Sequence, residues 1–187
     1  MALLHAESTR WVFGYGSLIW RPGFDHLGSS PALLRGAHRS LCIYSHRHRG
    51  TPDRPGLVFG LVRGGSCRGV AFEVEEQRWP DVHDYLRERE MDRGVYREAF
   101  RRVRLDNGRI VTALAFLVDD RHVQYAGRLN VAEQVRLVRS GVGESGPNHE
   151  YVLETARHLE QLGIRDRYLD ALVEALHGTD LPVIESA

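Results

Sequence analysis

Two acidic residues, Glu88 and Glu90, close a segment whose apolar residues recur at helical spacing over residues 75–92. Glu90 follows the apolar Leu86 by four residues and is expected beside it, whereas Glu88 is about 200° from Glu90 and faces away. A carboxylate beside apolar side chains is unfavourable unless it has a partner or a function. Glu90 is therefore a candidate acid/base, and an ion pair with Arg89 is the structural alternative.

A second chemical candidate is the stretch 11–20, which begins as a short apolar run typical of a buried strand. Gly14 and Gly16 then interrupt it, and Ser17 follows. Glycines at alternate positions let the chain turn sharply and present backbone N–H groups, which can bind a carboxylate or phosphate. A tight turn between two strands is an equally good interpretation of these residues taken alone.

The histidines and cysteines do not predict a metal site. His46 and His48 lie two residues apart in the Arg-rich segment 46–56, and no nearby carboxylate or cysteine completes a ligand set. The segment is expected to be an exposed loop that either receives an acidic substrate or is simply solvated. Cys42 and Cys67 have neither metal-ligand spacing nor the number needed for a disulfide framework.

Composition excludes several other classes. All 25 basic residues are arginine, so a lysine Schiff base and a phosphate-loop lysine are both impossible. The net charge of zero argues against nucleic acid or an anionic membrane as partner. No apolar stretch is long enough to span a membrane, and the N-terminus lacks a secretion pattern, so a cytoplasmic location is expected. The oligomeric state stays open.

The 187 residues are expected to form one domain, 1–187. Strands are predicted at 11–14, 40–44, 57–61, 69–74, 98–105 and 110–118, and further helices at 131–139, 148–162 and 167–176. Gly64-Gly65 and Asn107-Gly108 are expected to turn two hairpins. Because strands come first and helices cluster at the end, the order favours an α+β fold, a small mixed β-barrel with flanking helices.

Three motifs now coincide in this chain. They are Tyr15-Gly16-Ser17-Leu18 after the first strand, Arg89-Glu90 followed by Gly94-x-Tyr96-Arg97, and Gly146-Pro147-Asn148-x-Glu150-Tyr151 at the start of a helix. Segments 49–52, 55–57 and 63–71 lie between them. Over roughly residues 11–160 the sequence closely resembles the ChaC family of glutathione-specific γ-glutamylcyclotransferases.

The resemblance implies the γ-glutamylcyclotransferase-like fold and a lyase that degrades glutathione to 5-oxoproline and cysteinylglycine, without a metal or other cofactor. It implies that Glu90 is the catalytic acid/base. It also implies that the substrate-binding residues are Tyr15, Gly16, Ser17 and Leu18, which hold the γ-glutamyl group, with Tyr151 close to the pocket. The helical spacing independently selects Glu90 over Glu88.

This chemistry needs no nucleophile from the protein, because the α-amine of the substrate attacks its own γ-amide carbonyl. Holding the substrate folded supplies much of the rate, and one carboxyl group with a raised pKa can both accept and return a proton. Ser17 is then a hydrogen-bonding group. Two alternatives remain: a cyclotransferase for other γ-glutamyl peptides or amines, and a non-catalytic binding or regulatory protein of the same fold.

Overall fold

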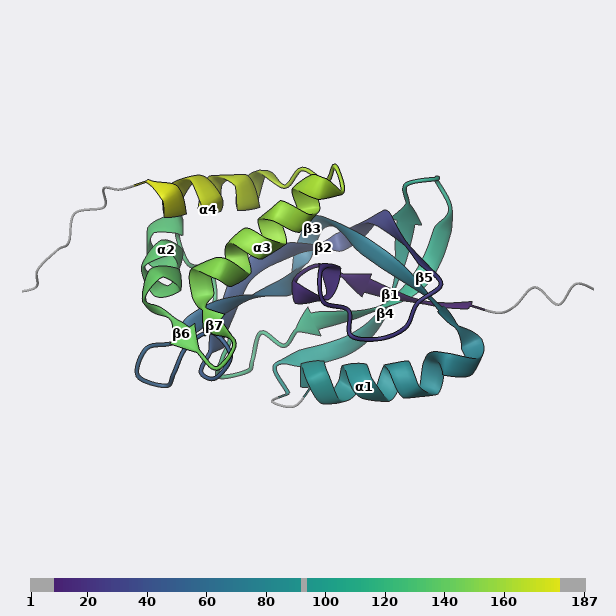
Figure 1. Cartoon of the computed structure of the whole chain (residues 1–187), viewed down its shortest axis with the longest axis horizontal. Helices are drawn as coiled ribbons and strands as arrows, with labels where there is room; N and C mark the ends of the chain where they lie inside the picture. Colours follow the sequence, from purple (N-terminus) through teal and green to yellow (C-terminus); the bar gives the residue numbers. More distant parts are fainter. Residues whose placement is uncertain (1–8, 92–93, 179–187) are drawn as a thin grey trace, which may run out of the picture.

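The computed structural model describes residues 9–91 and 94–178, which fold around a closed five-stranded barrel (Figure 1). Its strands run in the order β1 (Thr9–Gly14), β3 (Gly56–Glu75), β2 (Gly28–Ser45), β4 (Tyr96–Leu105) and β5 (Ile110–Val118). β5 pairs in parallel with β1 and with β3, while every other pairing in the barrel is antiparallel. The predicted α+β fold with a small mixed barrel is confirmed.

β2 and β3 are much longer than predicted, at 18 and 20 residues, and they pair along most of their length. The predicted hairpin over 62–68 is wrong, because Gly64 and Gly65 lie inside the continuous strand β3. Both have positive φ, +96° and +69°, opposite a register shift between Arg35 and Ala37 of β2. The two glycines therefore bend a long strand at a bulge and do not end it. The β2–β3 connection is the segment 46–55.

The helices agree closely with the predicted ranges. α1 (Trp79–Met91) follows a 3₁₀ turn, Glu76–Arg78, and the predicted end at Asp92 lies outside the described residues. α2 (Val131–Ser140), α3 (Asn148–Gln161) and α4 (Arg167–His177) come late in the chain, and the short pair β6 (Val142–Gly143) and β7 (Gly146–Pro147) separates α2 from α3. Within 9–91 and 94–178 no helix has the length and apolarity to cross a membrane.

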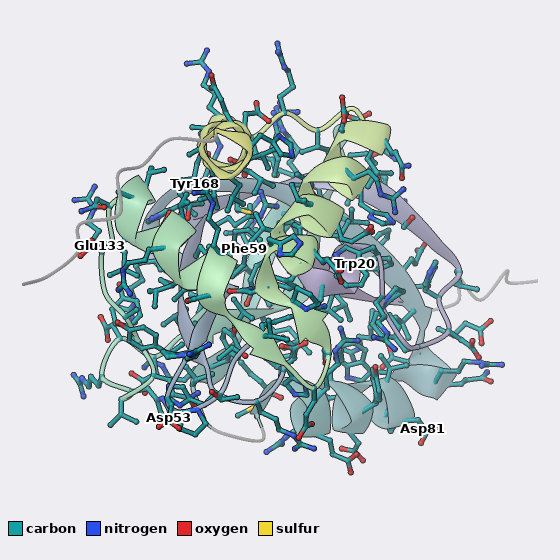
Figure 2. The ribbon with its side chains drawn as sticks, turned by 60° about the vertical axis from the view of Figure 1, so that its left-hand side comes forward. Trp20, Asp53, Phe59, Asp81, Glu133 and Tyr168 are labelled. Carbon is teal, nitrogen blue, oxygen red and sulfur yellow. The ribbon has the colours of Figure 1, made fainter. Side chains whose placement is uncertain are left out.

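The helices cover different sides of the barrel. In Figure 1 α2, α3 and α4 lie together on one side, and α1 lies alone along the other. α2 and α3 pack against β3, and α1 contacts β4. Figure 2 shows Phe59 at the centre beneath α3, whereas the exposed Asp53, Asp81 and Glu133 point outward at the rim.

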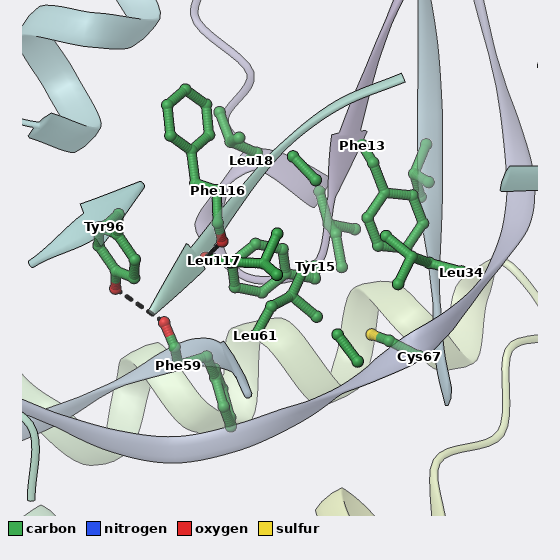
Figure 3. Packing of buried hydrophobic residues seen from close by; sticks show 14 of the residues in the cluster. Phe13, Tyr15, Leu18, Leu34, Phe59, Leu61, Cys67, Tyr96, Phe116 and Leu117 are labelled. Atoms are coloured by element: carbon green, nitrogen blue, oxygen red, sulfur yellow. Dashed lines mark hydrogen bonds between the residues drawn. The ribbon is translucent and has the colours of Figure 1, made fainter. Parts of the chain in front are cut away.

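Large apolar side chains fill the interior of the barrel, and burying them is the main driving force for folding (Figure 3). Phe13, Leu34, Leu61 and Phe116 are each at most 1% exposed. Tyr15, the first residue after β1, is also buried. The segment that follows β1 therefore starts from a fixed point inside the core.

Candidate active site

A cavity of about 450 Å³ opens between the barrel, the end of α1 and the start of α3. Its lining includes every residue singled out from the sequence as a site residue: Tyr15, Gly16, Ser17, Leu18, Glu90 and Tyr151. These side chains come from three segments that are far apart in the chain. The fold thus brings together in one place what the sequence shows only as separate motifs.

The orientation of α1 places the carboxyl group of Glu90 in this cavity. Leu86 is fully buried and fixes the face of the helix that meets the barrel. Glu90 lies one turn later with its side chain 17% exposed, while Glu88 is exposed. The two acidic residues therefore point as the helical spacing predicts. Burial raises the pKa of the Glu90 carboxyl group, and the charge of Arg89 opposes this rise.

Arg89 connects the end of α1 to the loop after β1. Its Nε lies 3.3 Å from Oε1 of Glu90, so the ion pair that the sequence offered as the structural alternative is present, in addition to the exposure of Glu90 to the cavity. The same guanidinium donates to Ser17 Oγ at 3.1 Å, to the carbonyl oxygen of Arg21 at 2.7 Å and to the hydroxyl of Tyr85 at 3.0 Å. Arg89 therefore fixes the glycine-containing loop relative to Glu90.

The loop itself turns sharply after β1. The 3₁₀ helix Ser17–Ile19 is closed by hydrogen bonds from the amides of Ile19 and Trp20 to the carbonyl oxygens of Gly16 and Ser17. Gly16 is needed for close approach, since a Cβ there would lie 3.1 Å from the hydroxyl of Tyr151. The loop and the first turn of α3 are consequently in van der Waals contact across the cavity.

Three of the tyrosines that line the cavity are buried, and two of these were among the predicted site residues. Tyr15 donates to the carbonyl oxygen of Phe116 at 2.8 Å, and Tyr96 donates to that of Phe59 at 2.9 Å (Figure 3). Tyr151 accepts from the amide of Phe59 at 3.1 Å. Burial raises the pKa of all three hydroxyl groups, so they are neutral at physiological pH. Tyr96 was not selected from the sequence, although its Gly-x-Tyr-Arg motif was noted.

Arg49 is a second residue that sequence reasoning missed. The prediction that segment 46–56 is an exposed loop holds for most of the segment but is wrong for Arg49, which is 8% exposed, for Gly50, and for Gly56, which is buried and begins β3. The guanidinium of Arg49 lines the cavity, donates to the carbonyl oxygen of Pro147 at 3.1 Å and lies 5.5 Å from the ring centroid of Tyr151. Contacts with α3 and the β6–β7 pair, invisible in the local sequence, bury it.

The family model and the similar known proteins all indicate the same family. Residues 10–178 match the family model described as "ChaC-like protein". The chain is 34% identical over 167 residues to the glutathione-specific γ-glutamylcyclotransferase of Escherichia coli, covering 89% of this chain and 72% of the relative. It is 33% identical over 181 residues to glutathione-specific γ-glutamylcyclotransferase 1 of Homo sapiens, covering 92% and 80% respectively.

Solved structures share the same architecture. A selenomethionine-labelled γ-glutamyl cyclotransferase specific to glutathione from yeast superposes with a TM-score of 0.83 at 24% identity, covering 90% of this chain and 96% of that one. A second structure, named γ-glutamyl cyclotransferase, gives a TM-score of 0.56 at 14% identity, with coverage of 93% and 91%. These likenesses establish the fold of the barrel and its helices.

Proposed function

The chain belongs to the ChaC-like family, and on that premise we propose that it is a γ-glutamylcyclotransferase that converts glutathione to 5-oxoproline and cysteinylglycine. The relatives from Escherichia coli and Homo sapiens carry this activity in their names. One observation in the structure carries the proposal furthest: the half-buried carboxyl group of Glu90 faces the same cavity as the Tyr15–Leu18 loop.

The reaction requires proton transfer at two nitrogen atoms. The α-amine of the γ-glutamyl group forms a bond to its own γ-carbon, and the bond from that carbon to the cysteine nitrogen breaks. The α-nitrogen loses two protons, one before attack and one as the lactam forms, and the departing nitrogen gains two and leaves as an ammonium. Glu90 is the group that carries these protons, one at a time, from the α-nitrogen to the leaving nitrogen. Atoms therefore balance with no other reactant.

The environment of Glu90 suits this double role. Burial raises the pKa of its carboxyl group, which makes the carboxylate a better base than an exposed glutamate, while Arg89 keeps the charged form accessible. The substrate supplies its own nucleophile, so the main task of the protein is to hold the γ-glutamyl chain in its folded conformation. Such positioning can supply a large part of a rate enhancement.

The loop after β1 is the proposed binding site of the γ-glutamyl group. The first amides of a helical turn have no partner within that turn, so those preceding Ile19 can donate to the α-carboxylate or to the developing oxyanion. The hydroxyl of Tyr151 accepts from Phe59 and can donate its own proton into the cavity. Ser17 Oγ accepts from Arg89, which supports a positioning role for this hydroxyl.

We further infer a cytoplasmic location. Both cysteines, Cys42 and Cys67, are free and buried, which suits a reducing compartment. Burial raises the pKa of Cys42 to about 12 and also raises that of Cys67, so neither thiol is a nucleophile at neutral pH.

The test is to incubate the purified protein with glutathione and to measure 5-oxoproline and cysteinylglycine, which should appear in equal amounts. We expect Glu90→Gln to lower kcat/KM by about a hundredfold or more, the usual effect of losing a general acid/base. Glu88→Gln is the matched control on the exposed face and should keep full activity. Full activity of the Glu90→Gln variant would exclude the proposed role.

Substrate choice is tested with a panel of γ-glutamyl compounds. Glutathione, γ-glutamylcysteine and γ-glutamyl amines share the reacting group and differ only beyond the scissile bond. The highest kcat/KM is expected for glutathione. A preference for a γ-glutamyl amine would favour the alternative cyclotransferase, and failure with every compound would favour a binding protein of this fold.

A further inference from the structure

We propose that Arg49 binds a carboxylate of the substrate and so determines which γ-glutamyl compounds the site accepts. The inference rests on the proposed function, because it places that function's substrate in the cavity. Arg49 is 8% exposed, and its guanidinium forms part of the cavity wall. A buried cation facing an open cavity is an unusual arrangement that calls for an anion.

The other arginines that line the cavity either pair with a carboxylate or are exposed to solvent. Four arginines line it: Arg21, Arg47, Arg49 and Arg89. Arg47 pairs with Glu144 at 2.7 Å, Arg89 pairs with Glu90 at 3.3 Å, and Arg21 is exposed to solvent. Among the residues that the structure describes, no carboxylate lies within 4.0 Å of the Arg49 guanidinium.

The only side-chain hydrogen bond recorded for Arg49 within the described ranges goes to a neutral acceptor, the carbonyl oxygen of Pro147. A guanidinium has five N–H donors arranged as a fork that matches a carboxylate. Burial lowers the pKa of Arg49, and the Glu150 carboxylate nearby, which does not pair directly with the guanidinium, opposes this only in part. A substrate carboxylate would supply the missing charge and two acceptors at once.

The backbone around Arg49 is built to hold it in place. A Cβ on Gly56 would lie 2.1 Å from the carbonyl oxygen of Arg49, and one on Gly141 would lie 2.6 Å from it. The Arg49 amide also donates to Ser45 Oγ at 3.0 Å. Three segments therefore close around this one peptide unit. A solvated surface arginine needs no such enclosure.

Tyr151 links Arg49 to the rest of the site. The guanidinium lies over the Tyr151 ring, at 5.5 Å from its centroid, and the Tyr151 hydroxyl lies against Gly16. A substrate whose γ-glutamyl group contacts the Gly16 loop would extend past Tyr151 toward Arg49. Glutathione has two carboxylates, the α-carboxylate of the γ-glutamyl group and the terminal carboxylate of glycine, and both have the chemistry that Arg49 recognises.

The experiment compares the steady-state kinetics of Arg49→Gln and Arg49→Lys with glutathione. Arg49→Gln should raise KM roughly tenfold to a hundredfold, the size expected for losing a charge-assisted hydrogen bond. The effect on kcat should be smaller, and Arg49→Lys should recover part of the affinity because it keeps the charge. Arg54→Gln, an exposed position on the same loop, is the matched control and should not change KM.

A second substrate distinguishes the two carboxylates. In glutathione amide the glycine carboxylate is replaced by a neutral carboxamide. If Arg49 binds the glycine carboxylate, the wild type should have a higher KM for glutathione amide than for glutathione. Arg49→Gln should then raise the KM for glutathione amide little further. If Arg49 binds the α-carboxylate, Arg49→Gln raises KM by the same factor for both substrates. An unchanged KM with both substrates would overturn the proposal.

Calorimetric titration with glutathione separates this inference from the proposed function and from misfolding. If the wild type makes 5-oxoproline but Arg49→Gln binds glutathione with unchanged affinity, the function stands and the inference fails. If the wild type makes no 5-oxoproline, the function fails, and weaker binding by Arg49→Gln still supports the inference. Thermal melting of both Arg49 variants identifies an unfolded protein, and Arg49→Lys then carries the test.

Discussion

Arg39 donates from Nε to the carbonyl oxygen of Tyr15 at 2.6 Å, and the same guanidinium pairs with Asp166. Its side chain is only 1% exposed, and a third hydrogen bond reaches the carbonyl oxygen of Arg68 at 2.7 Å. Asp166 also caps α4 by accepting from the amides of Tyr168 and Leu169. One buried side chain thus ties the last helix to the first residue of the cavity loop.

Asp166→Asn should lower the free energy of unfolding by about 3 kcal/mol, because it leaves the Arg39 charge buried without its anion. Asparagine keeps an acceptor for the helix cap, so the loss reports mainly the charge. Chemical denaturation measures the change. Asp170→Asn, an exposed position on the same helix, serves as control. A loss of less than about 0.5 kcal/mol, the range of ordinary surface substitutions, would contradict the prediction.

Asn148→Ala should destabilise the protein by about 2–4 kcal/mol, because two buried backbone groups lose their partner. The Asn148 side chain accepts from the amide of Leu57 at 2.6 Å and donates to its carbonyl oxygen at 2.7 Å. It is completely buried at the start of α3. His149→Ala, at the exposed neighbouring position, should have almost no effect on the denaturation midpoint. Equal midpoints for the two variants would show that β3 does not depend on this contact.

The elements that the sequence predicted well are those with strong local signals. Asn107-Gly108 forms the β4–β5 turn as expected, with φ of +85° at Gly108. The helical repeat around Leu86 correctly placed Glu90 inward and Glu88 outward. In both cases the pattern that decides the structure lies within a few residues, so no knowledge of the rest of the fold was required.

The failures concern features decided by distant contacts. Gly64-Gly65 has the same local signal as a hairpin, but pairing with β2 keeps the strand continuous and turns the glycines into a bulge. Arg49 lies in a polar, proline-rich segment that reads as exposed, yet Gly141 and Pro147 from later in the chain enclose it. No window of sequence around either feature contains the residues that determine it.

Gly16→Ala should reduce kcat/KM by about tenfold, because a displacement of the loop by a fraction of an ångström disturbs substrate positioning. The added Cβ would lie 3.1 Å from the Tyr151 hydroxyl. In a Tyr151→Phe background that oxygen is absent, so the same substitution should have a smaller effect. Gly28→Ala, where nothing lies within 4 Å, is the control. Strict additivity of Gly16→Ala and Tyr151→Phe would contradict the predicted contact.

Arg89→Gln should move the acidic limb of the kcat/KM profile to higher pH. The limb reports ionisation of the free enzyme, and Glu90 must be deprotonated to act as a base. Burial already raises the Glu90 pKa, and Arg89 is the charge that lowers it, so removing Arg89 raises it further. Arg89→Lys should give a smaller displacement because it keeps a positive charge. Arg87 is exposed on the same helix, so Arg87→Gln is the control and should not move the pH profile. An unmoved profile for Arg89→Gln would mean that a group other than Glu90 controls the acidic limb.

Glu90→Gln should stabilise the folded protein at neutral pH although it lowers kcat/KM. The pKa of Glu90 is raised in the folded state above its ordinary value of 4.5, chiefly by burial. Below that ordinary value the Glu90 carboxyl group is protonated in both the folded and the unfolded chain. The wild type and the Glu90→Gln variant then both carry a neutral side chain at this position, so their stabilities should be similar. As the pH rises through the ordinary value toward the raised one, the carboxyl group ionises in the unfolded chain but stays largely protonated in the folded one, so the wild type alone loses stability.

The difference between the two proteins should therefore open between acidic and neutral pH and then stay constant above the folded-state pKa. Denaturant melts of wild type, Glu90→Gln and Glu88→Gln at several pH values measure it. Glu88 is exposed, so Glu88→Gln should follow the wild type throughout. A Glu90→Gln variant less stable than the wild type at neutral pH would mean that the ion pair with Arg89 outweighs the burial of the carboxylate, and would remove the basis for a raised pKa.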